Sequence, residues 1–407
     1  MMASNSTFEC NTVPAEEGEL FVYEFAKHGI TGIQQYVTER LNKWRRIPLN
    51  IAVTGKAGAG KSTFINVIRG LKTGEEGAAH TDVTEGTKTI KSYKHPYNEN
   101  LVFWDLPGVG TENFKRANYD DKVNLAKYDF FLIFSSERFL ENDGWLAKEI
   151  RKMDKRFYFV RTKVFLDIFN EKKGRAFPRS RDEILSHIRI DCQQNLEGYG
   201  ISDSPVYLID NFEPYDFDFG MLQAKLIEDA PQLKREAMTF SIIGRTEELM
   251  FQKKKELQKR IPIISLESAV AGAVPVPGFG TAVDVGLMII EIMFYRDQFG
   301  LTEDAIKKSA VMLGVRTEEL TSELDMKLIL INCTEKGLIA LCNAFLISQA
   351  VEEVTKVVLP VIGSAIAGIL SYQSTSYCMT KILEQMYQDA LKINMKLSMH
   401  VAQSLAV

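Results

Sequence analysis

The sequence predicts an α/β domain, with a mostly parallel sheet covered by helices on both faces, followed by an all-helical region. Short apolar runs typical of strands alternate with stretches long enough for crossover helices, and this alternation is typical of parallel sheets. One run ends in a glycine-rich turn that leads into a helix. After about Pro214, helical periodicity dominates and strand-like runs almost vanish.

The individual elements follow from apolar spacing. Residues 16–46 carry the spacing of a helix. We then expect strands at residues 47–53, 101–104, 130–134, 157–160 and 206–209, and helices at residues 61–71, 143–153 and 180–196. These elements suggest three segments, namely an N-terminal helical segment 1–47, an α/β domain 48–214 and a helical domain 215–407.

Composition excludes several classes of protein. The net charge is −4, and a nucleic-acid-binding surface would need a basic bias, so we expect no nucleic-acid partner. The five cysteines show no C-x-x-C spacing, which favours free thiols in a reducing compartment. The N-terminus has no basic region before an apolar core, and position 2 is not glycine, so we expect neither a secretory signal nor N-myristoylation. A cytoplasmic protein is the expectation.

Three segments of the helical region admit two interpretations each. The basic cluster of Lys253, Lys254, Lys255, Lys259 and Arg260 is expected to be a solvated helix face, with a membrane surface as the alternative. The apolar segments 268–283 and 357–372 are expected to pack as a buried helical hairpin, because proline, glycine or polar residues interrupt or shorten them. Membrane association is the alternative for both.

Residues 55–62 match the spacing G-x-x-x-x-G-K-S, with an apolar strand before them and a helix after them. Glycines let successive backbone N–H groups point at phosphate oxygens, and the helix N-terminus adds a positive dipole. Lys61 would add a full charge near the β- and γ-phosphates, and Ser62 would offer a hydroxyl to Mg²⁺. The motif predicts a nucleoside triphosphate site.

A second carboxylate near the metal is expected from Asp105, which ends an apolar strand. Asp105 would hold Mg²⁺ through water, and the Gly108 N–H would sense the γ-phosphate. Residues 74–89 form a plausible mobile loop, from which a threonine would reach the metal only when the γ-phosphate is present. Thr81 is the first choice, with Thr84 and Thr87 behind it.

The chain resembles the immunity-related GTPases, the interferon-inducible p47-type family, over nearly its whole length. The resemblance is carried by residues 55–62, 64–66, 69–70, 76–81, 103–108, 128–131, 157–163, 275–278 and 360–368. It implies that helical segments from both chain ends flank a GTP-binding domain. It also implies GTP and GDP with Mg²⁺ as ligands, self-assembly in the GTP-bound state and action on internal membranes. Lys61 matches the branch of the family with lysine in the P-loop.

The resemblance extends the predicted site to the base of the nucleotide. The residues predicted to contact nucleotide are Gly55, Gly58, Ala59, Gly60, Lys61, Ser62, Thr63, Asp105, Gly108, Thr162, Lys163, Asp210 and Asn211. Those predicted to act in hydrolysis are Lys61, Ser62, Thr81 and Gly108, and those predicted to hold the metal are Ser62, Thr81 and Asp105.

Two positions depart from the family pattern at the base. The family reads guanine with Thr-Lys-x-Asp, but this chain has Phe165 in place of the aspartate. Phenylalanine accepts no hydrogen bond, and losing such bonds removes discrimination of ~10⁴–10⁵. Asp167 is a hypothetical substitute. Asp210 replaces the serine of the family's Ser-Asn pair, whereas Asn211 is retained.

Hydrolysis needs an oriented water, yet Val109 and Gly110 follow Gly108 and offer no side-chain base. We therefore expect slow turnover by the lone chain and, from the resemblance, acceleration by dimerisation through the nucleotide face. Peripheral association with internal membranes and contacts with related GTPases are further expectations. One alternative is a nucleotide-binding scaffold or regulator with little turnover and weakened guanine specificity. Another is an ATPase with relaxed base choice.

Overall fold

The computed structural model describes residues 15–81, 87, 89–111, 113–214, 216–242, 244, 246–273, 282–323 and 364–405. The chain divides into two compact units. One comprises Trp44–Leu249, and the other comprises Met1–Lys43 together with Met250–Val407. Both chain ends therefore contribute to the second unit, as the family resemblance implied.

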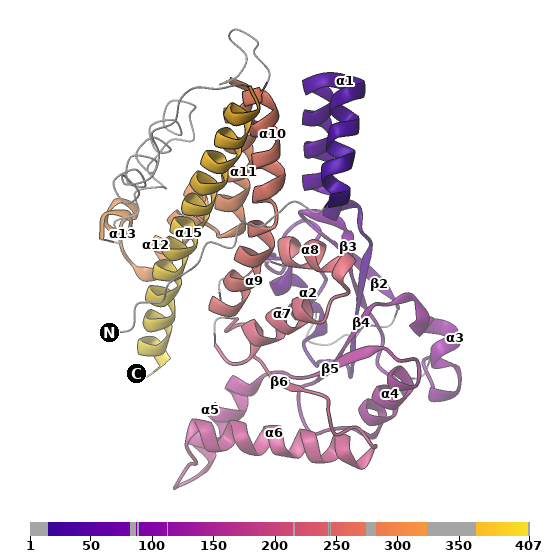
Figure 1. Ribbon diagram of the computed structural model, residues 1–407. Coiled ribbons are helices and arrows are strands. Elements are labelled where there is room, and N and C mark those ends of the chain that lie inside the picture. The colour runs from indigo at the N-terminus through magenta and orange to yellow at the C-terminus, as the bar shows by residue number, and fades with distance from the viewer. Residues whose placement is uncertain are drawn as a thin grey trace. The chain divides into compact units, whose positions relative to one another are not determined.

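The α/β unit is built on a six-stranded sheet with the strand order β2-β3-β1-β4-β5-β6 (Figure 1). Its strands are β1 (Leu49–Gly55), β2 (Lys91–His95), β3 (Asn98–Asp105), β4 (Phe130–Ser135), β5 (Arg156–Arg161) and β6 (Val206–Leu208). All neighbouring strands pair in parallel except β2, which runs antiparallel to β3. The predicted mostly parallel sheet is confirmed.

Helices connect the strands of this unit. They are η1 (Lys43–Arg46), α2 (Lys61–Ile68), η2 (Arg116–Asn118), α3 (Tyr119–Val123), η3 (Leu125–Lys127), α4 (Glu141–Lys152), α5 (Val164–Gly174), α6 (Arg181–Gly198), α7 (Phe219–Glu228) and α8 (Gln232–Ser241). The capping box at α6 shows why it starts where it does. Ser180 accepts a hydrogen bond from the Glu183 N–H, and the Glu183 carboxylate accepts one from the Ser180 N–H.

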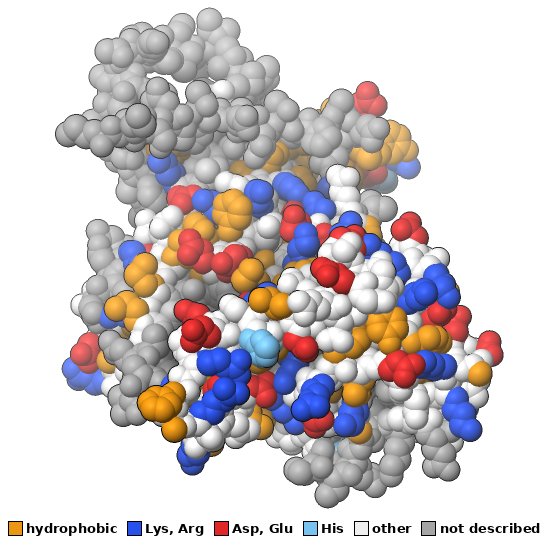
Figure 2. All heavy atoms as spheres, turned by 90° about the horizontal axis from the view of Figure 1, so that it is seen from below, with side chains coloured by type: hydrophobic (Ala, Val, Ile, Leu, Met, Phe, Trp, Pro, Cys, Tyr) orange, Lys and Arg blue, Asp and Glu red, His pale blue; other side chains and the backbone are white. Residues whose placement is uncertain are grey.

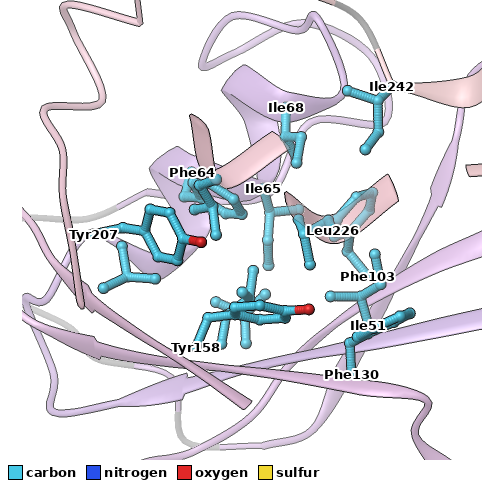
Figure 3. Packing of buried hydrophobic residues seen from close by; sticks show 14 of the residues in the cluster. Ile51, Phe64, Ile65, Ile68, Phe103, Phe130, Tyr158, Tyr207, Leu226 and Ile242 are labelled. Atoms are coloured by element: carbon cyan, nitrogen blue, oxygen red, sulfur yellow. The ribbon is translucent and has the colours of Figure 1, made fainter. Parts of the chain in front are cut away.

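One face of the sheet packs against α2 and α7. Alternate strand residues point to it, so Ile51 and Phe130 meet Phe64 of α2 and Leu226 of α7 in one buried cluster (Figure 3). The rings of Phe64 and Phe134 lie 5.0 Å apart in an edge-to-face arrangement. This packing fixes α2, and with it the glycine-rich loop that precedes it, against the sheet.

The intervening strand residues point to the opposite face. Ala52 and Phe131 belong to a second buried cluster that includes Tyr119 of α3, Leu146 of α4 and the free thiol Cys192 of α6. Strands buried on both faces explain why the sequence shows continuous apolar runs instead of alternation.

The predicted end of the α/β domain at residue 214 needs correction. The compact unit continues to Leu249 because α7 and α8 bury apolar side chains against the sheet. Leu222 and Leu226 of α7 and Met238 of α8 are fully buried in the cluster of Figure 3. Helical periodicity alone does not separate a sheet-covering helix from a helix of the next domain.

The second unit is all-helical in its described part. It contains α1 (Ala15–Asn42), α9 (Glu247–Gln258), α10 (Ile261–Ala273), α11 (Ala282–Gln298), α12 (Glu303–Leu313), α13 (Thr317–Glu323) and α15 (Ser364–Leu405), of which the first turn of α9 precedes the unit boundary. A buried ion pair ties α11 to the start of α10, because Arg260 Nε lies 2.6 Å from Glu291 Oε1 and both side chains are nearly inaccessible. Arg260 also donates to the Leu41 carbonyl at the end of α1.

The basic cluster at the end of α9 is therefore not a uniformly solvated face, contrary to expectation. Arg260 is buried in the ion pair with Glu291, and Lys253 is buried with its Nζ donating to the Gln298 carbonyl. Lys254 pairs with a glutamate of α15. Only Lys255 and Lys259 of the cluster are exposed. A one-sequence pattern cannot show that carbonyls and carboxylates of other helices face these amines.

Among the described residues, no helix is both long enough and apolar enough to cross a bilayer. Residues 274–281 and 324–363 lie outside the described part of the chain. The central part of the 268–283 segment and the first half of the 357–372 segment are thus untested, and the choice between a buried hairpin and membrane association remains a prediction.

Charge on the molecular surface is mixed. The face shown in Figure 2 has Lys and Arg side chains interspersed with Asp and Glu, and its hydrophobic side chains stand singly or in small groups. Exposed ion pairs such as Arg151–Asp203 and Arg181–Asp216 belong to the α/β unit. On the described part of this face, neither sign of charge gathers into a single large patch.

Candidate nucleotide site

The loop between β1 and α2 requires glycine at three positions. Gly55, Gly58 and Gly60 have φ angles of 138°, 79° and 83°, which L side chains rarely adopt. A Cβ on Gly55 would also lie 2.1 Å from the Phe134 carbonyl oxygen of β4. The loop is thus held tightly at the carboxyl edge of the sheet, where backbone N–H groups are free to face an anion.

Lys61, the first residue of α2, is 4% exposed. Its Nζ donates to the carbonyl oxygens of Gly55 at 2.9 Å and Lys56 at 3.2 Å, so the side chain lies across the loop. Burial lowers the pKa of Lys61, and the negative charge of Asp105 acts in the opposite direction. A buried ammonium within a ring of backbone amides is suited to bind phosphate oxygens.

Ser62 and Asp105 meet at the end of the sheet. Ser62 Oγ donates to Asp105 Oδ2 at 2.7 Å, and Thr87 Oγ1 donates to Asp105 Oδ1 at 3.0 Å. β3 pairs with β1 so that Asp105 lies opposite Val53, which brings the carboxylate beside the loop. The sequence-predicted pair is therefore assembled in the fold.

This donor set fits Mg²⁺ that arrives with a nucleotide. Among the described residues, no cluster of three or more His, Cys, Asp or Glu side chains could hold a metal by itself. Mg²⁺ typically takes one or two protein oxygens and completes its octahedron with waters and phosphate oxygens. The Ser62 hydroxyl and the Asp105 carboxylate supply that minimal protein share.

The threonines of the 74–89 loop contact different partners. Thr81 donates to Thr73 at 3.2 Å and does not contact Asp105 in this structure, whereas Thr87 does. Thr84 lies outside the described residues. The first choice, Thr81, is thus not brought to the metal side here, and its predicted role in the triphosphate-bound state stays a prediction.

Gly108 approaches the glycine loop closely. A Cβ at this position would lie 2.7 Å from the Gly55 carbonyl oxygen, so only glycine lets the two loops meet. Tyr119 supports the approach, because its hydroxyl donates to the Pro107 carbonyl at 2.9 Å and lies 3.1 Å from Thr54 Oγ1. Sequence reasoning missed Tyr119, since a tyrosine in a short helix carries no distinctive signal.

Asn142 of α4 is a second contact that sequence reasoning missed. Its Nδ2 donates to the Val109 carbonyl at 2.9 Å, and its Oδ1 accepts from Arg116 Nε at 2.7 Å. Gly110, with φ of 89°, has no room for a Cβ because Asn142 Nδ2 would lie 2.2 Å away. The asparagine therefore holds the loop that follows Gly108.

On the other side of the glycine loop, β5 and β6 contribute Thr162 and Asn211. Thr162 Oγ1 donates to the Ala59 carbonyl at 2.9 Å, and Asn211 Nδ2 donates to the Gly60 carbonyl at 2.9 Å. Lys163, with φ of 60°, is exposed and precedes α5. These residues of the predicted site are thus brought together, around the end of the loop opposite Asp105.

Two carboxylates near this end already accept hydrogen bonds from the protein. Asp167 Oδ2 lies 2.7 Å from Arg161 Nη2, so the hypothetical substitute for the missing aspartate is held by an ion pair. Asp210 Oδ1 accepts from the Phe212 N–H at 3.0 Å. Phe165, in the first turn of α5, is 40% exposed.

A glycine loop between β1 and α2, a buried lysine beside it and a strand-end aspartate facing a serine define a P-loop nucleotide-binding protein. The family model described as "Interferon-inducible GTPase (IIGP)" matches residues 22–397. The chain belongs to the interferon-inducible GTPase family.

Individual relatives agree with this assignment. The chain is 39% identical over 288 residues to mouse "Interferon-gamma-inducible GTPase 10", covering 71% of this chain and 69% of that protein. It is 40% identical over 262 residues to mouse "Interferon-inducible GTPase 1", covering 64% of this chain and 63% of that protein. A solved structure of Aquifex aeolicus Era with GDP and aluminium fluoride overlaps 57% of this chain and 69% of its own, with 15% identity and a TM-score of 0.32.

Family membership confirms two predictions made from the sequence. The protein is a GTPase, and it binds guanine nucleotides.

Proposed function

We propose that this protein is a Mg²⁺-dependent GTP-hydrolysing switch of the lysine-containing branch, which self-assembles and acts from the cytoplasm at internal membranes in innate immune defence. The single observation that carries the enzymatic part is the convergence of Lys61, Ser62 and Asp105 at one edge of the sheet. The interferon-inducible relatives support the immune part.

Each of these residues has a role that follows from its position. Bound Mg²⁺ would neutralise charge on the β- and γ-phosphates. Ser62 and Asp105 would hold the ion, Asp105 through water, and Lys61 would exchange its bonds to backbone carbonyls for bonds to phosphate oxygens. The Gly108 N–H would donate a hydrogen bond to the γ-phosphate. Asn142 of α4 would couple that helix to a change in position of the loop after Gly108, because it binds the Val109 carbonyl.

Slow turnover by the single chain follows from the loop after Gly108. Val109 and Gly110 offer no side chain that could orient a water, and the amide group of Asn142 already donates to the Val109 carbonyl. A second copy closing over the nucleotide would exclude bulk water and order the 74–89 loop. Self-association is therefore proposed to stimulate hydrolysis.

Action at a membrane surface is supported by apolar side chains that α1 leaves exposed. Leu20, Val22 and Tyr23 are each more than half exposed. Such side chains add apolar area for a peripheral contact with lipid. Related GTPases are proposed as further partners.

The second candidate function is a nucleotide-binding scaffold or regulator with little turnover. Two observations favour it, namely the lack of a side-chain base at Val109 and Gly110 and the phenylalanine at position 165. The intact Lys61, Ser62 and Asp105 arrangement favours the enzyme.

The experiment that tests the proposal measures phosphate release by the full-length chain over a wide range of protein concentrations, with Mg²⁺ and GTP. Activity per molecule is expected to rise with concentration. A flat, non-zero activity would contradict stimulation by self-association. Calorimetric binding of GTP without turnover at any concentration would favour the scaffold, and absence of binding would contradict both functions.

A further inference from the structure

The sheet order tells where the nucleoside end of a bound nucleotide lies. β1 carries the glycine loop, and β3 on one side of it brings Asp105 to the metal end. β5 and β6 lie on the other side of β1, and the residues that follow them contact the loop through Thr162 and Asn211. Ligands of open α/β sheets bind beyond the carboxyl ends of the strands, so the base lies among the residues after β5 and β6.

Asn211 offers a buried acceptor at this place. The residue is 7% exposed, and its Nδ2 is fixed by the Gly60 carbonyl at 2.9 Å. Its Oδ1 is buried and has no hydrogen-bond partner among the described residues. Buried acceptors without a partner are rare in folded proteins, and an N–H donor of a ligand would satisfy this one.

Two exposed phenyl groups belong to the segments that meet near that acceptor. Phe212, the next residue after Asn211, is 82% exposed, and Phe165 in the first turn of α5 is 40% exposed. The two segments are adjacent, since the Val164 N–H donates to the Ile209 carbonyl at 3.5 Å. Aromatic faces bind bases by stacking, and stacking tolerates any base because every base has a π face.

The carboxylates nearby are occupied by the protein itself. Reading guanine by its N1–H and N2–H₂ groups takes two acceptor oxygens of one carboxylate. Asp167 gives one oxygen to Arg161 at 2.7 Å, and Asp210 gives one to the Phe212 N–H at 3.0 Å. In each carboxylate one oxygen already accepts a hydrogen bond from the protein, so guanine would have to share that oxygen.

We propose that Phe165 and Phe212 hold the base by stacking, with Asn211 Oδ1 as the fixed polar contact, so that the site accepts purine nucleoside triphosphates with little preference among guanine, adenine and xanthine. This inference rests on the proposed function and widens its substrate class, with GTP as one of several substrates. Discrimination against the wrong purine by hydrogen bonds would be ~10⁴–10⁵, whereas stacking alone leaves a difference of about tenfold or less.

The test is competitive equilibrium binding of non-hydrolysable analogues of GTP, ATP and XTP to the full-length chain with Mg²⁺. The expected dissociation constants for the three analogues agree within about tenfold. A preference for the GTP analogue of about 10³-fold or more would overturn the inference while leaving the proposed function standing. If none of the three analogues binds, the proposed function is contradicted as well.

Two variants test the placement of the base. Phe165→Asp supplies a carboxylate at the start of α5, where an acidic side chain also suits the helix N-terminus. It is expected to raise the GTP-to-ATP affinity ratio by about 100-fold or more. Phe212→Ala is expected to weaken the binding of all three analogues by a similar factor, because it removes stacking area only.

Phe177 supplies the matched control. Its side chain is 93% exposed, and the residue follows α5, most of whose length, about 14 Å, separates it along the chain from Phe165. Phe177→Asp is expected to leave the GTP-to-ATP ratio unchanged. If Phe165→Asp melts at the wild-type temperature yet leaves the ratio unchanged, or if Phe177→Asp raises it equally, Phe165 does not face the base and the inference fails.

Discussion

Ser62 Oγ donates a hydrogen bond of 2.7 Å to Asp105 Oδ2, across 43 positions of the sequence. The contact joins the first turn of the P-loop helix to the end of the neighbouring strand β3. These are the two groups that would share a metal ion, and the fold itself brings them together. Groups that the fold holds in place lower the cost of binding.

Replacing Lys61 by alanine should remove the buried ammonium from the P-loop. We expect the affinity for GTP with Mg²⁺ to fall by about 100-fold, because a hydrogen bond between charged partners is lost. Calorimetric titration measures the change. Lys56→Ala is the matched control, since its exposed side chain pairs with Glu137, and it should change affinity by less than about threefold. Equal losses in both variants would contradict the role of Lys61.

Asp105→Asn should change how strongly GTP binding depends on Mg²⁺. The variant keeps the shape of the side chain but removes its charge, so the Mg²⁺ concentration at half-maximal GTP binding should rise about 10–100-fold. Binding in excess chelator should remain at the wild-type level. Asp203→Asn changes an exposed carboxylate of the same unit and should leave both measurements alone. An unchanged Mg²⁺ requirement in Asp105→Asn would show that the metal is held elsewhere.

Thr81→Ala and Thr87→Ala should separate the two candidate threonines. If Thr81 reaches the metal in the triphosphate state, its loss should lower kcat by about tenfold or more while GDP affinity stays the same. Thr87 donates a hydrogen bond to Asp105, so its loss should have the smaller effect on kcat. Steady-state phosphate release and GDP titration give both quantities. The reverse pattern would assign the metal contact to Thr87.

Asp143 should make stability depend on pH. Burial raises the pKa of this carboxyl to about 7, well above its ordinary range, although the Leu140 N–H and the charge of Lys56 oppose the shift. The folded state then holds a proton that the unfolded state releases, so the free energy of unfolding falls as pH rises from about 4 to about 7 and stays level above that range.

Asp143→Asn should remove this dependence. Its amide oxygen can still accept from the Leu140 N–H, as the carboxylate does at 3.2 Å. Relative to wild type, the variant should gain stability at about pH 8 compared with about pH 5, by at most about 3 kcal/mol. Urea unfolding at the two pH values measures the difference. Asp121→Asn, on the exposed side of α3, should change the free energy of unfolding by the same amount at both pH values. If Asp143→Asn changes the free energy of unfolding equally at both pH values, the raised pKa does not belong to Asp143.

Much of the fold was predictable because local chemistry specified it. Strands β1, β4, β5 and β6 are mostly apolar runs buried on both faces, and the second half of β3 is apolar as well, so composition alone marks them. β2 was missed because Lys91–His95 is polar, and it lies antiparallel at the sheet edge where one side needs no apolar cover. The extent of the α/β unit was misjudged at α7 and α8, since a helix pattern does not say which surface the helix covers.

The sequence by itself determined the glycine loop, Lys61, Ser62 and Asp105, because a phosphate site demands particular residue types at fixed spacing and at strand ends. Only the tertiary structure decided that Asn142 holds Val109, that Asn211 rests on Gly60 with a free acceptor, and that Arg260 pairs with Glu291. Those contacts join residues from separate elements. Their partners are selected by how strands and helices pack, and no spacing along the chain records that packing.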